Sequence, residues 1–600
     1  RISLAIGRLP GRSLADMRTM VDKIIRHETL APLDPWRNRI TFVADDGQTS
    51  TNPFEGSLHT AQAENLARSY TPTSFEQRKI YLIEYPTVNS ASGRRKPQVN
   101  EAIIDAFNRG SVVMNFTGHG NPRLWTHEAV FTREASIPRL MNRDRLTFLV
   151  AATCNFAQWD NPNEQSAGEL LLTMDRGGAI GVVTATRSVY SFDNAELNYV
   201  LYSYLFGRDS TGASVRVGDA FFAMKQIRYA TNDQKYHLLG DPTSRLARPQ
   251  GAAAVDSVNG LSTASIAVIP SLGRAAVAGS VRNGLGALRT DFNGRGLLEL
   301  FDSKRFVTVP EWGGYAFEVQ GSALYRGEVS VTGGMFQAQV PVPKDVTFGS
   351  RARLALYATS GTTDAVGVTE QVTIFGTDST ATADTTGPVI SIAVGADEFR
   401  PGDVVPPDPL LIVRLSDASG VNTSTVGIGH RLEAELTEDG RVIGLGEVYR
   451  GDLDTYQSGR AVTQLTGLSE GRHTVRVRAW DIRNNSSSLE TVFEVRAGSD
   501  VDLFQVTNYP NPMTDGTVFT FQRTSGTAVS VEVRVYTVAG RLVQRLEVAH
   551  VADLVVRVPW DGRDREGASL ANGVYLYKVI ARTLDRARSQ EYIGKLAVVR

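Results

Sequence analysis

Short apolar runs and amphipathic stretches alternate along the first 245 residues. The apolar run RITFVAD (39–45) has the length and composition of a buried strand. The stretch 14–25 instead places its apolar residues on one helical face, and the stretch 99–110 ends on Gly110, the residue type that commonly ends helices. Apolar strands that alternate with helices predict an α/β domain with a mostly parallel sheet covered on both faces. The predicted strands lie at 2–6, 39–45, 79–85, within 111–120, within 146–160 and within 177–187, and the predicted helices at 14–25, 59–69, 99–110, 166–176, 194–206 and 216–229.

After Pro249 the helical periodicity ends, and alternating strand patterns continue to the last residue. Runs such as MFQAQVPVP and HTVRVRAWD alternate apolar with polar positions and are bounded by Gly, Ser and Asp, which is typical of β-sandwiches. A Thr/Asp/Ala-rich stretch at 376–388 separates two such modules, and a third begins near Val501. We therefore expect an α/β domain at 1–249 and all-β modules at 250–385, 386–500 and 501–600.

Composition narrows the function classes. The formal net charge of −1 gives no overall basic field for nucleic acid or an anionic membrane. No apolar run reaches the ~18 residues that a membrane-spanning helix needs. The chain opens RISLAIGRLP without an initiator Met or a charged-then-apolar leader, so we expect a trimmed N-terminus.

Two apolar runs end on residues that can do chemistry. SVVMNFTGHG (111–120) ends at His119, and LTFLVAATCNFAQWD (146–160) contains Cys154, the single cysteine of the chain. Ligands of open α/β sheets bind where the carboxyl ends of strands meet, so neighbouring strands would bring imidazole and thiol to one cleft. A nearby imidazole takes the thiol proton and makes a sulfur nucleophile for acyl transfer. The backbone amides of Gly120 and Cys154 are candidate donors to the oxyanion.

Other interpretations of the same residues stay open. A single cysteine is often a small core residue, and a lone histidine is often structural. A metal centre would need a cluster of ligands, which one cysteine and scattered histidines do not offer. A serine hydrolase would need a G-x-S-x-G elbow, which the α/β region lacks. The matched positions favour a cysteine peptidase or transpeptidase, and we expect no metal and no cofactor.

The motifs NFTGHG and ATCNFAQWD resemble those of the gingipain-type cysteine peptidases, relatives of the caspases with a His-Gly and Cys dyad. EAIIDAFNRG before the histidine strand and LLGDP at the end of the domain fit the same family. The resemblance covers residues 1–250. It implies a caspase/gingipain-like α/β domain with Cys154 as nucleophile and His119 as the group that moves protons.

The resemblance also implies an acid that orients the histidine. FVADDG places Asp46 in the matching region, Asp45 is the alternative, and both acids could simply cap a turn. The acidic pocket residue of the Arg-specific members has no clear counterpart, although Glu55 is nearby. Trp125 and Asn155 are candidates to line the cleft, and packing is the alternative role of Trp125.

Within this family, the outer-membrane sortases of type IX secretion fit more closely, through AIGRLP, FVADDGQ, SAGELLL, TATRSVYS and the β-rich tail after LLGDP. The last module resembles a type IX C-terminal sorting domain, with YPNP near its start and NGVYLYKV near its end. The resemblance implies an enzyme on the surface of a Gram-negative bacterium, associated with the outer membrane. Such an enzyme removes C-terminal sorting domains from secreted cargo and transfers the cargo to an anionic lipopolysaccharide through a Cys acyl-enzyme. The implied partners are cargo proteins, the lipopolysaccharide acceptor and an outer-membrane β-barrel shuttle protein, with no nucleic acid.

Two other functions remain alternatives at this point. One is a secreted gingipain-like general endopeptidase that carries its own sorting domain. The other is a non-enzymatic surface protein, in which the α/β domain only supports β-modules for adhesion.

Overall fold

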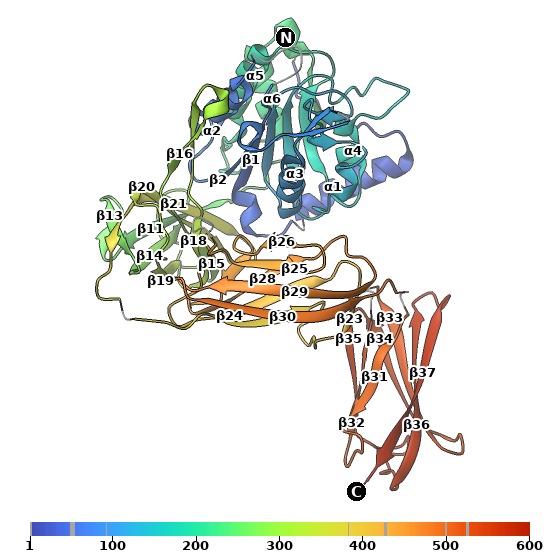
Figure 1. The fold of residues 1–600 in the computed structure, drawn as a ribbon. Coiled ribbons are helices and arrows are strands. Elements are labelled where there is room, and N and C mark those ends of the chain that lie inside the picture. Colours follow the sequence, from blue (N-terminus) through green and yellow to red (C-terminus); the bar gives the residue numbers. More distant parts are fainter. Residues whose placement is uncertain are drawn as a thin grey trace.

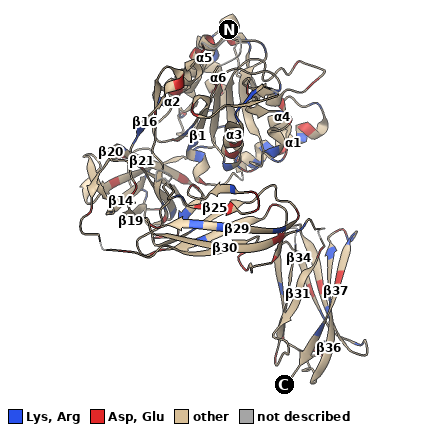
Figure 2. Ribbon diagram, in the orientation of Figure 1, with Lys and Arg blue, Asp and Glu red and all other residues tan. Residues whose placement is uncertain are grey.

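The computed structural model describes residues 3–29, 31–47, 55–91, 93–381, 383–424, 429–498, 501–523 and 527–599. An α/β domain is followed by β-modules, the last of which extends away toward the C-terminus (Figure 1). Basic and acidic residues are interspersed over all these parts (Figure 2). The order of an α/β domain and then all-β modules confirms the fold class expected from the sequence.

A six-stranded sheet forms the centre of the α/β domain, in the order β10-β9-β8-β5-β1-β2. The neighbours from β9 to β2 run parallel, and β10 pairs antiparallel with β9. The strands are β1 (Arg39–Ala44), β2 (Glu76–Tyr81), β5 (Val113–Thr117), β8 (Thr147–Ala152), β9 (Ala179–Ala185) and β10 (Tyr236–Gly240). The helices are α1 (Leu14–Thr29), α2 (Leu58–Ser69), α3 (Pro97–Arg109), α4 (Ala167–Thr173), α5 (Ser191–Leu205), α6 (Val217–Ile227) and α7 (Thr231–Gln234). Short pairs are formed by β3 (Val88–Ser90) with β4 (Gly93–Arg95) and by β6 (Leu124–Trp125) with β7 (Phe131–Thr132).

Alternation along the strands divides the domain core into two layers. Successive side chains of a strand point to opposite faces, so Phe42 packs in one cluster and Val43 in the other, both fully buried. Helices α2, α5 and α6 cover the first face, and α1, α3 and α4 cover the second. This cover explains why these strands read as continuous apolar runs. It also leaves the carboxyl ends of β1, β5 and β8 at one shared edge.

The N-terminal segment differs from the prediction. The sequence predicts a strand over 2–6, but residues 3–6 form none, and Leu4 and Ile6 are exposed. Only a single bridge, Arg8 with Leu239, joins this segment to β10. Because β10 already pairs with β9 and forms the edge of the sheet, the N-terminal segment adds no full strand there.

Three further apolar cores follow the α/β domain, within residues 255–374, 394–495 and 501–598. The first contains strands β11 (Gly251–Val258), β12 (Leu261–Ser262), β13 (Ala267–Ser271), β14 (Arg274–Arg282), β15 (Gly294–Phe301), β16 (Arg305–Val309), β17 (Tyr315–Val319), β18 (Ala323–Val331), β19 (Met335–Pro341), β20 (Gly349–Thr359) and β21 (Asp364–Thr377). The second contains β22 (Val389–Val394), β23 (Val404–Val405), β24 (Leu410–Ser416), β25 (Glu433–Leu436), β26 (Arg441–Gly444), β27 (Tyr449–Gly451), β28 (Ser458–Gln464), β29 (Gly471–Trp480) and β30 (Ser486–Val495). The third contains β31 (Phe504–Tyr509), β32 (Thr517–Gln522), β33 (Val529–Thr537), β34 (Leu542–Val551), β35 (Val555–Trp560), β36 (Gly573–Thr583) and β37 (Ser589–Val598).

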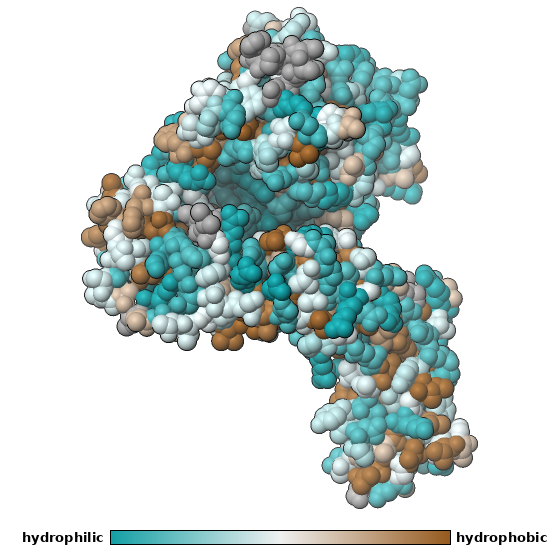
Figure 3. Space-filling view, viewed as in Figure 1, coloured by the Kyte–Doolittle hydropathy of each residue, from teal (hydrophilic) through white to brown (hydrophobic). Residues whose placement is uncertain are grey.

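The first β-module is joined to both of its neighbours. Gly327 of β18 pairs with Gly451 of β27, so strands of the first and second modules belong to one continuous sheet. On the other side, Phe317 of β17 packs into the core of the α/β domain, against Tyr81. A cavity of about 850 Å³ remains between the α/β domain and the first module, and Figure 3 shows a hydrophilic hollow between these parts. None of the helices within the described residues is both long and apolar enough to cross a bilayer.

Glu532 of β33 lies among three arginines in the last module. Its side chain is nearly buried and forms ion pairs with Arg534, Arg545 and Arg582. Burial alone would raise the pKa of the Glu532 carboxyl, but hydrogen bonds from Arg534 and Arg582 and the charge of Arg545 outweigh it and lower the pKa to about 2. The ionised carboxylate therefore stabilises the folded module.

We expect this stabilisation to be complete above the unfolded-state pKa of about 4.5 and to be lost as the pH falls toward 2. Hydrogen exchange of residues 501–599 in the whole chain, corrected for intrinsic rates, measures it. E532Q should show less protection than wild type at pH 5 and equal protection near pH 2. Equal protection at pH 5 would contradict the prediction.

Candidate active site

Cys154 and His119 occupy matching positions at the ends of neighbouring strands. Strands β5 and β8 pair parallel, with Thr117 opposite Ala152, and each reactive residue lies two positions beyond that last pair. The Gly118 amide continues the pairing by donating to the Ala152 carbonyl at 3.3 Å. Neighbouring strands lie about 4.8 Å apart, so the two residues leave the sheet side by side. The sheet adjacency that the dyad requires is therefore present.

The two glycines beside His119 let its loop pack closely against neighbouring residues. A Cβ on Gly118 would lie 2.3 Å from the Asp45 Cβ, and one on Gly120 would lie 2.6 Å from Thr153 Oγ1. Gly118 also has a φ of +157°, which side-chain-bearing residues rarely adopt. Thr153 directly precedes the nucleophile candidate. The glycines thus hold the histidine loop against both neighbouring strand ends.

Glu55 is the carboxylate that contacts the His119 ring. Its Oε2 lies 2.7 Å from His119 Nε2, and its Oε1 lies 3.4 Å from Nε2 of His59 on α2. The imidazole of His59, and then that of His119, lower the pKa of Glu55 to about 2. An ionised Glu55 accepts a hydrogen bond from the N–H at Nε2 of His119, which leaves Nδ1 as the nitrogen available to a thiol. Glu55 therefore occupies the position of an orienting acid.

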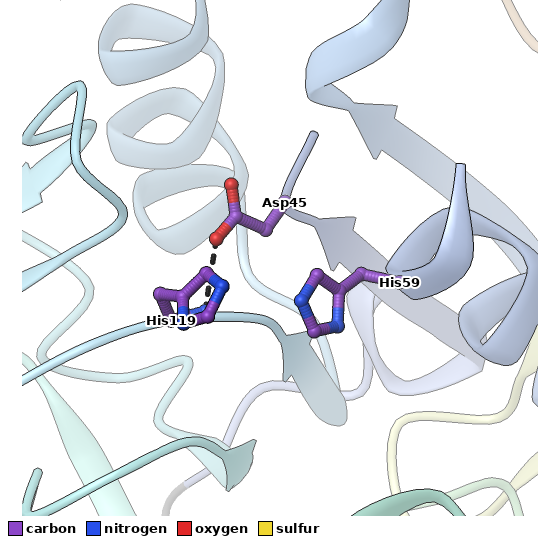
Figure 4. Close-up of side chains that lie close together, drawn as sticks. All are labelled: Asp45, His59 and His119. Atoms are coloured by element: carbon purple, nitrogen blue, oxygen red, sulfur yellow. Dashed lines mark hydrogen bonds between the residues drawn. The ribbon is translucent and has the colours of Figure 1, made fainter. Parts of the chain in front are cut away.

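Asp45 holds the backbone of the histidine loop. Its Oδ2 accepts the His119 amide at 2.9 Å, shown as the dashed line in Figure 4, and its Oδ1 accepts the Gly47 amide at 3.1 Å. Figure 4 also shows the ring of His59 beside this pair. Donor atoms of Asp45, His59 and His119 lie within 4.8 Å of one another. These three side chains could hold a metal ion, and so could the neighbouring group of Asp45, Asp46 and Glu128.

Asp46 does not take the role that the sequence analysis assigned to it. Its buried carboxylate lies 3.3 Å from Lys96 Nζ and 3.4 Å from an Arg94 nitrogen, whereas Glu55 contacts the His119 ring. Successive residues of an extended chain point to opposite sides, so Asp45 and Asp46 cannot both face the histidine loop. The buried Glu128 lies close to the carboxylates of Asp46 and Asp45. Burial, and then the charges of Asp46 and Asp45, raise the pKa of Glu128 to about 7.

The Cys154 thiol is half-buried against the loop after β9. Its sulfur accepts the Val189 amide at 3.4 Å and lies 3.5 Å from the Val189 carbonyl. The next residue, Asn155, has a φ of +54°, so the chain turns sharply after the nucleophile candidate. The Asn155 amide bonds to the Arg187 carbonyl, and its side-chain oxygen is buried without a hydrogen-bond partner.

The Gly120 amide points toward the β8 side of the loop. Amides two residues apart in an extended chain point the same way, and the Gly118 amide faces β8. Gly120 also forms an antiparallel bridge with Trp125. The hydrogen bonds of this bridge are made by the residues on either side, from the Asn121 amide to the Leu124 carbonyl and from the Thr126 amide to the His119 carbonyl. In such a pair the N–H of Gly120 itself points away from Trp125. Within the described residues, neither the Gly120 nor the Cys154 amide donates a hydrogen bond. Both amides remain candidate donors to an oxyanion.

Trp125 does not line a cleft. The residue is completely buried, stacks on Phe116 at a centroid distance of 4.3 Å and packs against Phe131 and Phe156. A side chain enclosed by three aromatic rings cannot contact a substrate. Trp125 instead supports the loop that carries His119, through the backbone bridge between Trp125 and Gly120.

Sequence reasoning underestimated Glu55 and missed His59. Glu55 precedes α2, and His59 lies in its first turn. The two are four positions apart, a spacing that brings side chains together at a helix start. That spacing was the available signal. Their distance from His119 along the chain, more than 50 positions, concealed the contact.

Two family models match the chain. The model of peptidase family C25 matches residues 1–247, and the model of the FlgD Ig-like domain matches residues 508–585. The first match covers the whole α/β domain with the Cys154 and His119 motifs. The second match indicates an Ig-like fold for the last module.

Individual relatives agree with the first match. Gingipain R2 and Gingipain R1 of Porphyromonas gingivalis are each 28% identical over 152 residues, which is 25% of this chain but only 18% and 14% of the relatives' lengths. The chain thus spans less than a fifth of these curated relatives.

Among solved structures, dimeric latent PorU from Porphyromonas gingivalis is 26% identical, with 71% of this chain and 41% of PorU covered and a TM-score of 0.30. The Arg-specific cysteine proteinase gingipain R is 16% identical, with 62% and 75% covered and a TM-score of 0.32. Residues 1–247 are therefore similar to the gingipain-type cysteine peptidases of peptidase family C25.

Proposed function

We propose that this chain is a cell-surface sortase that cleaves cargo proteins ahead of their C-terminal sorting domains and transfers them to an amine acceptor. The observation that carries the proposal is the in-register placement of Cys154 and His119 at the ends of β8 and β5. The hydrogen bond that Glu55 accepts from Nε2 of His119 supports it, because an oriented imidazole is what a thiol nucleophile needs.

The first half-reaction follows from these positions. Nδ1 of His119 takes the Cys154 proton, and the thiolate attacks the carbonyl carbon of the scissile peptide bond. The carbonyl electrons move to oxygen, where the Gly120 and Cys154 amides stabilise the negative charge. His119 then gives its proton to the departing amine as the carbon–nitrogen bond breaks. The sorting domain leaves with a new N-terminus, and the cargo remains as a thioester on Cys154.

The second half-reaction releases the cargo. An acceptor amine attacks the thioester carbon, His119 removes a proton from the attacking nitrogen, and the proton returns to the Cys154 sulfur as it leaves. An amide bond to the acceptor replaces the thioester. Water in place of the amine gives hydrolysis, so transfer requires that the amine reach the thioester first.

The family likeness supports the wider setting of this proposal. We assign the acceptor to an anionic lipopolysaccharide, the delivery to an outer-membrane β-barrel shuttle, and the location to the outer surface of a Gram-negative cell. We assign the sorting role to the Ig-like module at 508–585. Its own core and two sheets show a module that packs independently of the α/β domain.

The proposal predicts transfer to an amine. The whole chain is incubated with a reporter protein fused to residues 497–600 of this sequence, with and without glycine amide, and the products are weighed by mass spectrometry. We expect a thioester adduct on Cys154 and a cargo product that carries the mass of glycine amide. An unrelated reporter without the C-terminal domain is the control and should remain intact.

The other outcomes correspond to the two alternatives. Release to water alone, together with cleavage of casein and of the control reporter, would identify a general endopeptidase. A Cys154 that iodoacetamide does not modify in the folded chain would identify a non-enzymatic surface protein. Either result would overturn the sortase proposal.

A further inference from the structure

The cavity of about 850 Å³ between the α/β domain and the first β-module lies where Figure 3 shows a hydrophilic hollow. On the α/β side it reaches Arg39 and Glu76, the first residues of β1 and β2. The active-site groups instead follow the carboxyl ends of the strands, and six steps of extended chain from Arg39 to Asp45 span roughly 20 Å. The cavity is therefore separate from the active site. Its volume lies in the range of small-molecule sites, about 300–1,000 Å³.

The lining of this cavity is basic. Ten of its 26 residues are Lys or Arg, and four are Glu. Three acids outside the lining also pair with lining cations, namely Glu64, Asp105 and Glu299. After these seven acids are counted, three positive charges remain in excess. A cleft with an excess of one charge concentrates ions of the opposite sign.

Three of the lining cations share two carboxylates. Glu370 lies 2.7 Å from Lys304 and 3.7 Å from Arg353. Arg351 lies 2.9 Å from Glu318 and 3.3 Å from Glu370. Burial lowers the pKa of the Arg353 guanidinium, and the charge of Glu370 offsets only part of this effect. A buried cation that shares its counter-charge in this way would gain from a further anion.

Two arginines of the lining have no acidic partner. Arg68 belongs to α2 and Arg305 begins β16, and within the described residues neither forms an ion pair. Both are exposed, so a ligand can reach them. Because one comes from the α/β domain and the other from the first β-module, a ligand that binds both would bridge the two parts.

From this lining we propose that the cavity binds a saccharide that carries two or more phosphate groups. Eight of the ten cations are arginines, whose planar forks bind phosphate oxygens in pairs. A phosphate monoester has a charge of about −1.5 to −2 near pH 7, so two of them balance the excess of three. Seven Thr, Ser and Gln residues can hydrogen-bond to sugar hydroxyls, and only four lining residues are apolar side chains. An acyl chain would find too little apolar surface there.

The site exists only while the α/β domain and the first β-module are docked. Arg353 joins them by donating to the backbone carbonyls of Thr73 and Ser74 at 2.6 and 3.0 Å. A ligand that binds the docked form alone stabilises it by mass action. The phosphorylated saccharide should therefore raise the melting temperature of the chain. This proposal requires no catalysis and does not rest on the proposed function.

The binding test uses the whole chain with glucose-1,6-bisphosphate as the probe. Calorimetric titration at low ionic strength should show one site, and added NaCl should weaken it by screening. The double variant R68Q/R305Q should weaken binding at least about tenfold, because two cationic forks are lost. Neither substitution leaves an acid without an ion-pair partner, so the fold should tolerate both. Glucose itself should not bind.

Vesicle flotation distinguishes two sources of such a saccharide. Phosphatidylcholine vesicles are prepared with and without lipopolysaccharide. Binding to the lipopolysaccharide vesicles that R68Q/R305Q loses would assign the cavity to the phosphorylated headgroup of a lipid. Binding of the soluble bisphosphate without vesicle binding would assign it to a free sugar phosphate.

The double variant R460Q/R472Q is the matched control. Arg460 of β28 and Arg472 of β29 are exposed, form no ion pair within the described residues and lie outside the cavity lining. This variant should bind the probe as wild type does. Absence of binding, equal binding by R68Q/R305Q, or an equal loss in the control would each overturn the site. Tighter binding of pyrophosphate than of the sugar bisphosphate would overturn the assignment to a saccharide.

Discussion

Replacing Cys154 by alanine is expected to lower kcat/KM for reporter cleavage at least about 10⁴-fold. Removing the nucleophile of a catalytic dyad or triad lowers the rate by this much, because the other catalytic groups have little effect without it. Cys154 is the single cysteine, so no other thiol can substitute for it. The assay follows release of the domain 497–600 from the reporter by mass spectrometry.

Two measurements separate this loss from damage to the fold. C154A removes one half-buried sulfur whose contacts are with the Val189 backbone, so the melting temperature should change little. Iodoacetamide should modify wild-type Cys154 at neutral pH and do so more slowly in H119A, because the imidazole supports the thiolate. Residual activity in C154A above about 1% would show that Cys154 is not the nucleophile.

The α/β sheet was predictable because it is buried on both faces. Strands such as β5 and β8 read as unbroken apolar runs, and their helices repeat apolar residues at helical spacing. Edge elements were less predictable. Leu4 and Ile6 look like strand residues but stay exposed, because β10 takes the sheet edge. Several segments can compete to pair at the edge of a sheet. The hydrophobic pattern of one segment does not show which of them will pair there.

The reactive pair was visible in sequence because each residue directly follows an apolar strand. The groups around it were not visible, since they meet only through the fold. Asp45 and Asp46 are adjacent in sequence, and only the direction of β1 decides that Asp45 faces the histidine loop while Asp46 faces Lys96. Trp125 is near His119 in sequence, yet its apolar surface is enclosed by aromatic rings. Proximity along the chain is a poor guide to contact with substrate.

Replacing Glu55 by glutamine is expected to lower kcat about 10²–10⁴-fold. Glu55 accepts a hydrogen bond from His119 Nε2 at 2.7 Å and so selects the tautomer with Nδ1 free for the thiol. A glutamine amide can donate to Nε2 and would stabilise the opposite tautomer, with the proton on Nδ1. The Glu55 side chain is partly exposed, so the fold should tolerate the change. The measurement is kcat per folded chain, with the folded fraction taken from thermal melting.

D46N is the matched variant because it makes the same kind of carboxylate-to-amide change at the acid that the sequence favoured. Asp46 pairs with buried Lys96, and leaving a buried charge without its partner costs about 3–5 kcal/mol, so D46N should lower the melting temperature. Its kcat per folded chain should stay within about threefold of wild type, because the carboxylate that contacts the His119 ring is Glu55. If D46N lost more kcat than E55Q, Asp46 would be the orienting acid after all. Because E55Q should change the rate and D46N the stability, the two variants assign the acid.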